Sequence, residues 1–293
     1  MIRQSISHII FSALLSILLT GVSCRAAEVL IIADAQLKPV LDVTQGIRKT
    51  LHSYTKTLSP AEVKGNLAIV VQQEEARVVI ALGRDALAEA LTLPPSIPVI
   101  YDMVVTPPAI NRPNTAGFYM ATPAGEYADL VRKYLPSLKQ VAVIASRDTL
   151  NILANNASAP ISSHSVKNIA EFVSTIKQLE KADAILLLPD NSVINATALE
   201  ETYLHSFRRS IPLLGISERN VREGALLALV VDMVNVGKVI GEYATKALKS
   251  GSVGQQSASP PRKFELFLNM DTARKMRISI PNEVVRMARK VYP

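Results

Sequence analysis

Cysteine is almost absent from this sequence, because Cys24 is the only one among 293 residues. If the N-terminal segment is removed after Ala26, as argued below, no cysteine remains. Such a chain has no disulfide framework, no thiolate nucleophile and no cysteine metal site. Its stability must therefore come from a hydrophobic core. Removal of 26 residues from 293 leaves 267, a length at which one core tends to divide into two.

Aromatic residues are also scarce, at 5% of the chain, and there is no tryptophan. The formal net charge is +7, of which Arg3 and Arg25 in the first 26 residues account for two. The other basic residues are dispersed along the chain. Nucleic-acid binding normally requires a basic stripe with interleaved aromatic side chains. The composition therefore predicts no nucleic-acid partner.

The motifs of common catalytic sites are missing. The sequence has no Gly-x-Gly-x-x-Gly run, no phosphate-binding Walker A loop and no Gly-x-Ser-x-Gly elbow. No pair among the four histidines has the spacing of metal ligands. We therefore predict no enzyme activity, no cofactor and no metal. One alternative stays open, a hydrolase or isomerase that uses carboxylates such as those of Asp102 and Glu218.

The N-terminus has the pattern of an export signal. Ile9–Val22 is an uncharged, mostly apolar run, shorter than the roughly 20 residues that span a bilayer. Small residues follow, so we predict a signal peptide over residues 1–26 and an extracytoplasmic or periplasmic mature chain. An uncleaved signal anchor is one alternative. Another is a lipid anchor at Cys24, although Gly21 stands where lipoprotein signals usually carry a bulky aliphatic residue.

The mature chain alternates short aliphatic runs with segments of helical spacing. Val29–Ala33, Arg77–Leu82 and Pro98–Tyr101 read as strands buried on both faces, and the segments between them read as helices. Continuous apolar strands separated by helices indicate parallel βαβ units. We therefore expect a doubly wound α/β lobe over residues 27–118.

The same alternation restarts after the proline-rich segment Thr106–Pro113. It predicts a second lobe over residues 119–224. A strand near 225–231 and a long helix from Met233 follow, and the chain is then expected to re-cross between the lobes. Part of 225–262 would thus join the first lobe and part of 263–293 the second. Ser252–Pro261 is expected to be a loop, and a tail helix is expected from Pro281. The predicted fold is two doubly wound parallel-sheet lobes joined by a hinge.

Ligands of open parallel sheets bind at the carboxyl ends of the strands. The polar residues just after the predicted strands are therefore the candidate ligand-binding residues: Asp34, Gln36, Gly83, Arg84, Asp102, Ser146, Asp190, Asn191, Ser217, Glu218 and Asp232. Asp, Ser and Asn also favour helix N-caps, so each position has a structural alternative. Tyr101 and Tyr119 are the nearest aromatic residues, either for stacking on a ligand or for core packing.

Short motifs in the last third of the chain follow one another in a distinctive order: Pro189-Asp190, Ile211–Gly215, Ser217-Glu218, Val221–Leu226, Asp232, Val236-Gly237, Gly241, Ala247–Gly251, Phe264–Asn269, Thr272-Ala273 and Ile278–Pro281. This order resembles the ABC-transporter substrate-binding family related to tryptophan/tyrosine-type binding proteins. The resemblance implies a type I periplasmic-binding-protein fold.

Two segments depart from the pattern of that family. Met103–Asn114 is proline-rich and lacks the family's Asp-Pro-x-x-Ala-Gly-Leu loop, and Arg274–Arg277 stands where Ala-x-x-Leu-Gly is usual. The family's aromatic amino-acid specificity is therefore not carried over.

Together the residues and the resemblance predict a monomeric, extracytoplasmic solute-binding component of an ABC-type transporter. It would capture a small polar molecule, such as an amino acid, by hinge closure and present it to a membrane permease. The alternative is a sensor of the same fold that signals to a membrane receptor kinase.

Overall fold

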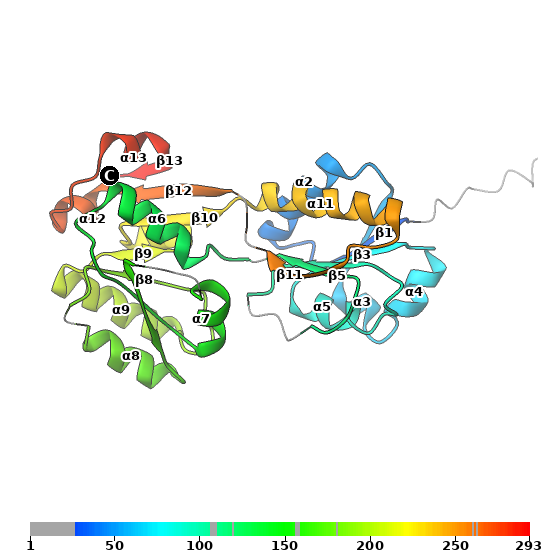
Figure 1. Cartoon of the computed structure of the whole chain (residues 1–293), viewed down its shortest axis with the longest axis horizontal. Coiled ribbons are helices and arrows are strands. Elements are labelled where there is room, and N and C mark those ends of the chain that lie inside the picture. Colours follow the sequence, from blue (N-terminus) through cyan, green and yellow to red (C-terminus); the bar gives the residue numbers. More distant parts are fainter. Residues whose placement is uncertain are drawn as a thin grey trace, which may run out of the picture.

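We describe a computed structural model of the chain, which places residues 27–105, 110–118, 120–155, 159–179, 181–259, 261 and 263–293. The predicted signal peptide, Cys24 and Tyr119 lie outside these residues. The described chain forms two α/β lobes that lie end to end along the long axis of the molecule (Figure 1). None of the helices described is long and apolar enough to cross a membrane.

The N-terminal lobe is built on a six-stranded sheet in which all pairings are parallel. Its order is β11-β5-β4-β3-β1-β2. The strands are β1 (Val29–Ala33), β2 (Thr55–Leu58), β3 (Val78–Leu82), β4 (Val99–Asp102), β5 (Thr115–Phe118) and β11 (Gln255–Ser259). The aliphatic runs of β1 and β3 are buried at every position, as expected for strands covered on both faces.

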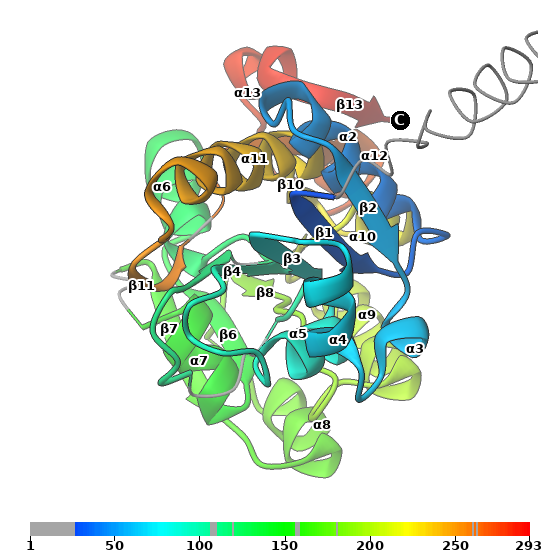
Figure 2. The same ribbon diagram turned by 90° about the vertical axis from the view of Figure 1, so that its right-hand side faces the viewer.

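Helices cover both faces of this sheet (Figure 2). On one face lie α2 (Lys38–Thr50) and α11 (Met233–Ser250), which belong to opposite ends of the chain. On the other face lie α3 (Pro60–Val63), α4 (Leu67–Gln73) and α5 (Arg84–Ala90). The α2–α11 pair packs so closely that a Cβ on Gly237 would overlap the carbonyl oxygen of Val43, and one on Gly46 would overlap that of Val234. Glycine at both positions allows this approach.

The C-terminal lobe is built on a seven-stranded sheet of order β13-β12-β10-β9-β8-β6-β7. All of its pairings are parallel apart from β10–β12, which is antiparallel. The strands are β6 (Val141–Ala145), β7 (Ile161–Ser165), β8 (Ala184–Leu186), β9 (Leu213–Gly215), β10 (Leu227–Val231), β12 (Phe264–Asn269) and β13 (Ala288–Tyr292). The helices are α6 (Ala124–Tyr134), α7 (Arg147–Leu153), α8 (Ile169–Lys177), α9 (Ala196–Arg209), α10 (Glu218–Glu223), α12 (Met270–Lys275) and α13 (Asn282–Met287).

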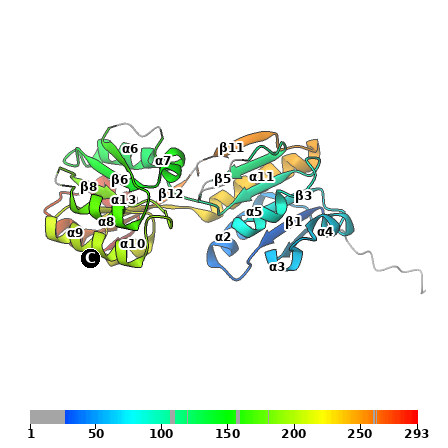
Figure 3. The same cartoon turned by 90° about the horizontal axis from the view of Figure 1, so that it is seen from below.

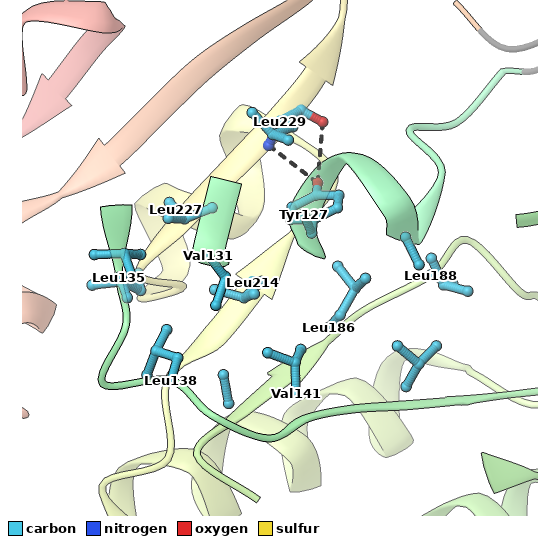
Figure 4. Packing of buried hydrophobic residues seen from close by; sticks show 14 of the residues in the cluster. Tyr127, Val131, Leu135, Leu138, Val141, Leu186, Leu188, Leu214, Leu227 and Leu229 are labelled. Atoms are coloured by element: carbon cyan, nitrogen blue, oxygen red, sulfur yellow. Dashed lines mark hydrogen bonds between the residues drawn. The ribbon is translucent and has the colours of Figure 1, made fainter. Parts of the chain in front are cut away.

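Tyr127 of α6 is hydrogen-bonded to Leu229 of β10 within the core of the C-terminal lobe (Figure 4), and it also contacts Gly215 of β9. The ring is fully buried among the leucines and valines of the sheet. Its hydroxyl lies 2.5 Å from the Gly215 carbonyl oxygen, to which it donates, and accepts a hydrogen bond from the Leu229 amide over 3.1 Å. Burial raises the pKa of this phenol, against smaller opposing effects of the Leu229 and Thr122 hydrogen bonds, so it stays a neutral donor.

The chain passes between the lobes three times: from β5 to α6, from β10 to α11 and from β11 to β12. Figure 3 shows these connections gathered in the middle of the molecule. The prediction of two doubly wound, mainly parallel lobes is confirmed. One local expectation was wrong, because Gln255–Ser259 is not a loop but the edge strand β11. The tail helix expected from Pro281 is confirmed as α13, and the strand β13 that follows it was not expected.

Candidate ligand-binding site between the lobes

A pocket of about 440 Å³ has walls from both lobes and from the connection between them. It lies where the carboxyl ends of β4, β6 and β8 come together, as the rule for open parallel sheets requires. Its lining consists of Arg84, Met103, Val104, Val105, Met120, Ser146, Asp148, Thr149, Pro189, Asp190, Asn191 and Ser192.

The wall from the N-terminal lobe combines one cation with an apolar surface. Arg84 is the first residue of α5, directly after β3 and Gly83, whose φ of 106° suits glycine. The Arg84 side chain is exposed and makes no hydrogen bond or ion pair with another described residue. Met103 and Val104 follow β4 and supply apolar surface.

The wall from the C-terminal lobe is organised by the buried carboxylate of Asp190. The carboxylate accepts hydrogen bonds from the Ser146 amide at 2.7 Å, the Ser192 amide at 3.1 Å and the Ser192 hydroxyl at 2.5 Å. Burial alone would raise the pKa of Asp190, but the hydrogen bonds from Ser146 and Ser192 outweigh it and hold this pKa below its ordinary value. Asp190 is therefore a charged anchor whose oxygens are already engaged.

Ser146 also caps α7, because its hydroxyl accepts a hydrogen bond from the Thr149 amide at 3.3 Å. This cap places Asp148, in the first turn of α7, on the pocket wall. Asp148 and Asn191 are exposed, and neither side chain is hydrogen-bonded to another described residue. The polar groups left for a ligand are thus the Arg84 guanidinium from one lobe and the Asp148 carboxylate and Asn191 amide from the other.

The structure brings four of the eleven predicted residues onto the pocket wall: Arg84, Ser146, Asp190 and Asn191. The other seven lie outside this lining: Asp34, Gln36, Gly83, Asp102, Ser217, Glu218 and Asp232. The candidate residues did not include the other eight of the lining: Met103, Val104, Val105, Met120, Asp148, Thr149, Pro189 and Ser192. The available signal for Asp148 was its place in the first helical turn after a strand end.

Most of the seven residues outside the lining have local partners. The Asp34 carboxylate accepts from the Gln36 amide, while Ser217 and Asp232 cap α10 and α11. Glu218 accepts hydrogen bonds from Lys290, at 3.0 Å, and from the Tyr292 hydroxyl, both on β13. The pKa of Glu218 is lowered by the Tyr292 and then the Lys290 hydrogen bond. A ligand-binding role for these residues stays a prediction.

Asp102 ends β4 with its side chain fully buried. Alternation along β4 puts it on the face of Ile100, beneath the α2–α11 pair, and pairing places it beside Leu82. Neither carboxylate oxygen is hydrogen-bonded to another described residue. Burial raises the pKa of Asp102 to about 7, and the nearby Met103 amide offsets part of this rise. The carboxyl group therefore faces the lobe interior and not the pocket.

No group of three or more His, Cys, Asp or Glu side chains within the described ranges is arranged to hold a metal ion. Of the charged groups in the pocket lining, Asp190 is engaged by Ser146 and Ser192, which leaves Arg84 and Asp148 for a ligand, together with the Asn191 amide and the apolar wall. Such an arrangement can hold a small molecule that carries both charges.

Comparisons with known proteins identify the family of the chain and relatives of its fold. A family model described as "ABC transporter substrate binding protein" matches residues 45–292. No curated protein matches the chain. Among solved structures, a conserved domain protein from Vibrio cholerae O1 biovar El Tor superimposes with a TM-score of 0.59 at 18% identity, over 91% of this chain and 99% of that one.

Two further structures share the fold. An ABC domain from Streptococcus pneumoniae in complex with L-Trp has a TM-score of 0.55 at 18% identity, over 90% of this chain and 99% of its own. A substrate-binding protein with adhesive properties from Clostridium difficile, in a ligand-free, open structure, has a TM-score of 0.65 at 14% identity, over 90% of this chain and 98% of its own. At these identities the likeness shows the fold, which is the type I periplasmic-binding-protein fold.

Proposed function

We propose that this chain, which belongs to the ABC transporter substrate-binding protein family, captures a small zwitterionic solute such as an amino acid between its two lobes. The single observation that carries this proposal is the pocket shared by the lobes, with an unpaired cation on one wall and an unpaired carboxylate on the other. Its volume of about 440 Å³ lies within the range of small-molecule sites.

Arg84 would hold the anionic end of the solute. A guanidinium presents a planar set of donors that matches a carboxylate in two parallel hydrogen bonds. Asp148 would accept from the ammonium group, and Asn191 can either donate or accept. Asp190 would not contact the ammonium group, since its oxygens already receive three hydrogen bonds from Ser146 and Ser192.

The apolar part of the solute would pack against Met103, Val104 and Met120. Methionine side chains are flexible and adapt to different shapes. The described pocket lining contains no aromatic ring, so we expect an aliphatic side group to fit at least as well as an aromatic one.

Capture would be coupled to hinge motion, because Arg84 and Asp148 belong to different lobes that are joined by three connections. A solute that bridges both groups binds the closed arrangement better than the open one and shifts the equilibrium towards it. The closed form would then be presented to a membrane permease. The export signal predicted over residues 1–26 would place this step outside the cytoplasm. No covalent chemistry is required.

A thermal-shift panel of amino acids, nucleosides, sugars and oxyanions tests the proposal. A ligand that binds only the folded state stabilises it by about 2.7 kcal/mol at a hundredfold excess over its dissociation constant. We expect the shift with a zwitterion that is recovered unchanged. Titration calorimetry of Arg84→Ala and Asp148→Asn should then show affinity reduced at least about tenfold.

Matched control variants separate the pocket from general charge effects. Arg208→Ala and Asp85→Asn remove exposed charges of the same types outside the pocket lining and should leave affinity unchanged. Equal losses in the pocket variants and the controls would refute the assignment of this pocket. Turnover of the ligand would instead support an enzyme.

A further inference from the structure

A second pocket, of about 420 Å³, lies in the C-terminal lobe at the end remote from the first. Three of its walls are the segments that precede β6, β8 and β9, and the fourth is the connection between α12 and α13. Segments that precede parallel strands lie at the amino edge of the sheet, whereas the interlobe pocket lies at the carboxyl edge. The two pockets therefore lie at opposite ends of the strands of the same sheet.

Two arginines from separate segments reach this amino-edge pocket. Arg209 is the last residue of α9, and Arg277 follows α12. Both are exposed, and neither guanidinium forms an ion pair or hydrogen bond with another described residue. By contrast, Arg274, one turn before Arg277, is paired with Asp271 at 3.5 Å. The amino-edge pocket thus holds two unpaired guanidinium groups.

One carboxylate also lines the amino-edge pocket. An oxygen of Asp183 accepts a hydrogen bond from the Gln140 amide at 2.9 Å, which ties the start of β8 to the start of β6. Because the lining contains two arginines, Arg209 and Arg277, and one acid, Asp183, its net charge is +1. The Ser137 and Ser210 side chains add hydroxyl groups at the rim.

The base of the amino-edge pocket is apolar. Leu138, Leu179 and Ile211 line it and are themselves buried, with 5%, 9% and 8% of their surface exposed. The pocket therefore pairs a cationic rim with an aliphatic base.

We propose that the amino-edge pocket binds an amphipathic anion, a phosphate or carboxylate head carried on an aliphatic tail. Guanidinium groups recognise both kinds of head through paired hydrogen bonds. The tail would lie against Ile278, which is half-buried, and the small exposed parts of Leu138 and Ile211. Removal of the tail's own apolar surface from water would supply most of the added affinity. Such an anion can come from a membrane lipid or from a free metabolite, and the chemistry is the same for both. The site does not depend on the solute proposed for the interlobe pocket.

Titration calorimetry of the purified protein with octyl phosphate tests this site, with inorganic phosphate as the tail-free probe. We expect octyl phosphate to bind at least about tenfold more tightly than phosphate, and binding to weaken with added salt. The double variant Arg209→Gln with Arg277→Gln should lose at least about tenfold in affinity. Either single variant should lose part of it.

The double variant Arg208→Gln with Arg222→Gln is the matched control, because it removes two exposed arginines of the same lobe outside the pocket lining. It should bind octyl phosphate as the unchanged protein does. Thermal unfolding of each variant checks that the fold is retained. The Arg209 and Arg277 variants should also keep the response to the solute of the interlobe pocket.

Sedimentation with phosphatidylglycerol vesicles, and with phosphatidylcholine vesicles as the neutral reference, distinguishes the two sources. Arginine-dependent binding to the anionic vesicles would identify a lipid headgroup. Arginine-dependent binding of octyl phosphate alone would identify a free amphipathic anion. No binding of octyl phosphate or anionic vesicles, or binding that the Arg209 and Arg277 substitutions leave unchanged, would overturn the proposal.

Discussion

The Ser146 amide donates a hydrogen bond to the Asp190 carboxylate, with 2.7 Å between nitrogen and oxygen. This contact joins the carboxyl ends of β6 and β8, which are neighbours in the sheet. The contact also explains why Asp190 and Asp148, two acids on the same pocket wall, have different roles. Asp190 holds the wall together, whereas Asp148 is left exposed for a ligand.

Asp190→Ala should destabilise the protein by about 2 to 4 kcal/mol, because the amides of Ser146 and Ser192 and the Ser192 hydroxyl lose their acceptor. Asp148→Ala removes an exposed acid from the same wall and should change stability by less than about 0.5 kcal/mol. Urea unfolding of the two variants measures this difference. Equal stability of both would contradict the anchoring role of Asp190.

Gly237→Ala should destabilise the N-terminal lobe by at least about 2 kcal/mol, because the added methyl group meets backbone atoms of α2 that cannot rotate away. Gly125→Ala is the matched change in α6, where an added Cβ has nothing within 4 Å. It should be neutral or stabilise by up to about 1 kcal/mol. Thermal unfolding compares the two, and tolerance of alanine at Gly237 would show that the helices are less closely packed.

Tyr127→Phe should cost about 1 to 3 kcal/mol, because the Leu229 amide loses its acceptor and the Gly215 carbonyl its donor inside the core. Tyr134→Phe also removes a phenolic hydroxyl from α6, but that group bonds Glu283 in an exposed position. Its effect should be below about 0.5 kcal/mol. Guanidinium unfolding monitors both, and similar small losses would mean that the buried hydroxyl contributes nothing.

Asp102 should make stability fall as pH rises. Burial raises its pKa from 3.8 to about 7 in the folded chain, so the folded state keeps its proton over a range in which the unfolded state has lost it. Stability from this group is complete below about pH 4 and decreases until about pH 7, by at most about 4 kcal/mol. Asp102→Asn should flatten this part of the profile and raise stability at pH 8 relative to the wild type.

Unfolding of the wild type and Asp102→Asn at several pH values between 4 and 8 measures this slope. Asp34→Asn, an exposed acid at the end of β1, serves as the control and should keep the slope of the wild type. Parallel profiles for all three proteins would show that Asp102 is ionised in the folded state.

The central strands were predictable from sequence, and several edge strands were not. β1, β3 and β6 are fully buried aliphatic runs that carry their own signal. Three edge strands lack such an aliphatic run: β11 (Gln-Gln-Ser-Ala-Ser), β7 (Ile-Ser-Ser-His-Ser) and β13 (Ala-Arg-Lys-Val-Tyr). Each of them is held in its sheet by backbone hydrogen bonds to one neighbouring strand. The amino-acid composition of a segment does not show whether such a neighbour exists.

The sequence predicted at which end of the strands the candidate site lies, but not which of the residues there line the pocket. The rule that ligands bind beyond strand ends selected Arg84, Ser146 and Asp190, which line the pocket. It could not tell that Glu218 contacts β13, because that strand was itself not foreseen. It also could not tell on which face of the sheet Asp102 lies, since this depends on where β4 ends.

Capture by lobe closure is tested most directly by the distance between the lobes with and without the solute. The chain from Ala27 onward has no cysteine, so Ala88→Cys on α5 and Lys167→Cys beyond β7 offer one exposed labelling site on each lobe. Fluorescence energy transfer between labels at these sites should increase on addition of the solute found in the panel. The increase should be absent in Arg84→Ala. A solute that binds tightly while the transfer efficiency stays constant would contradict capture by closure of the two lobes.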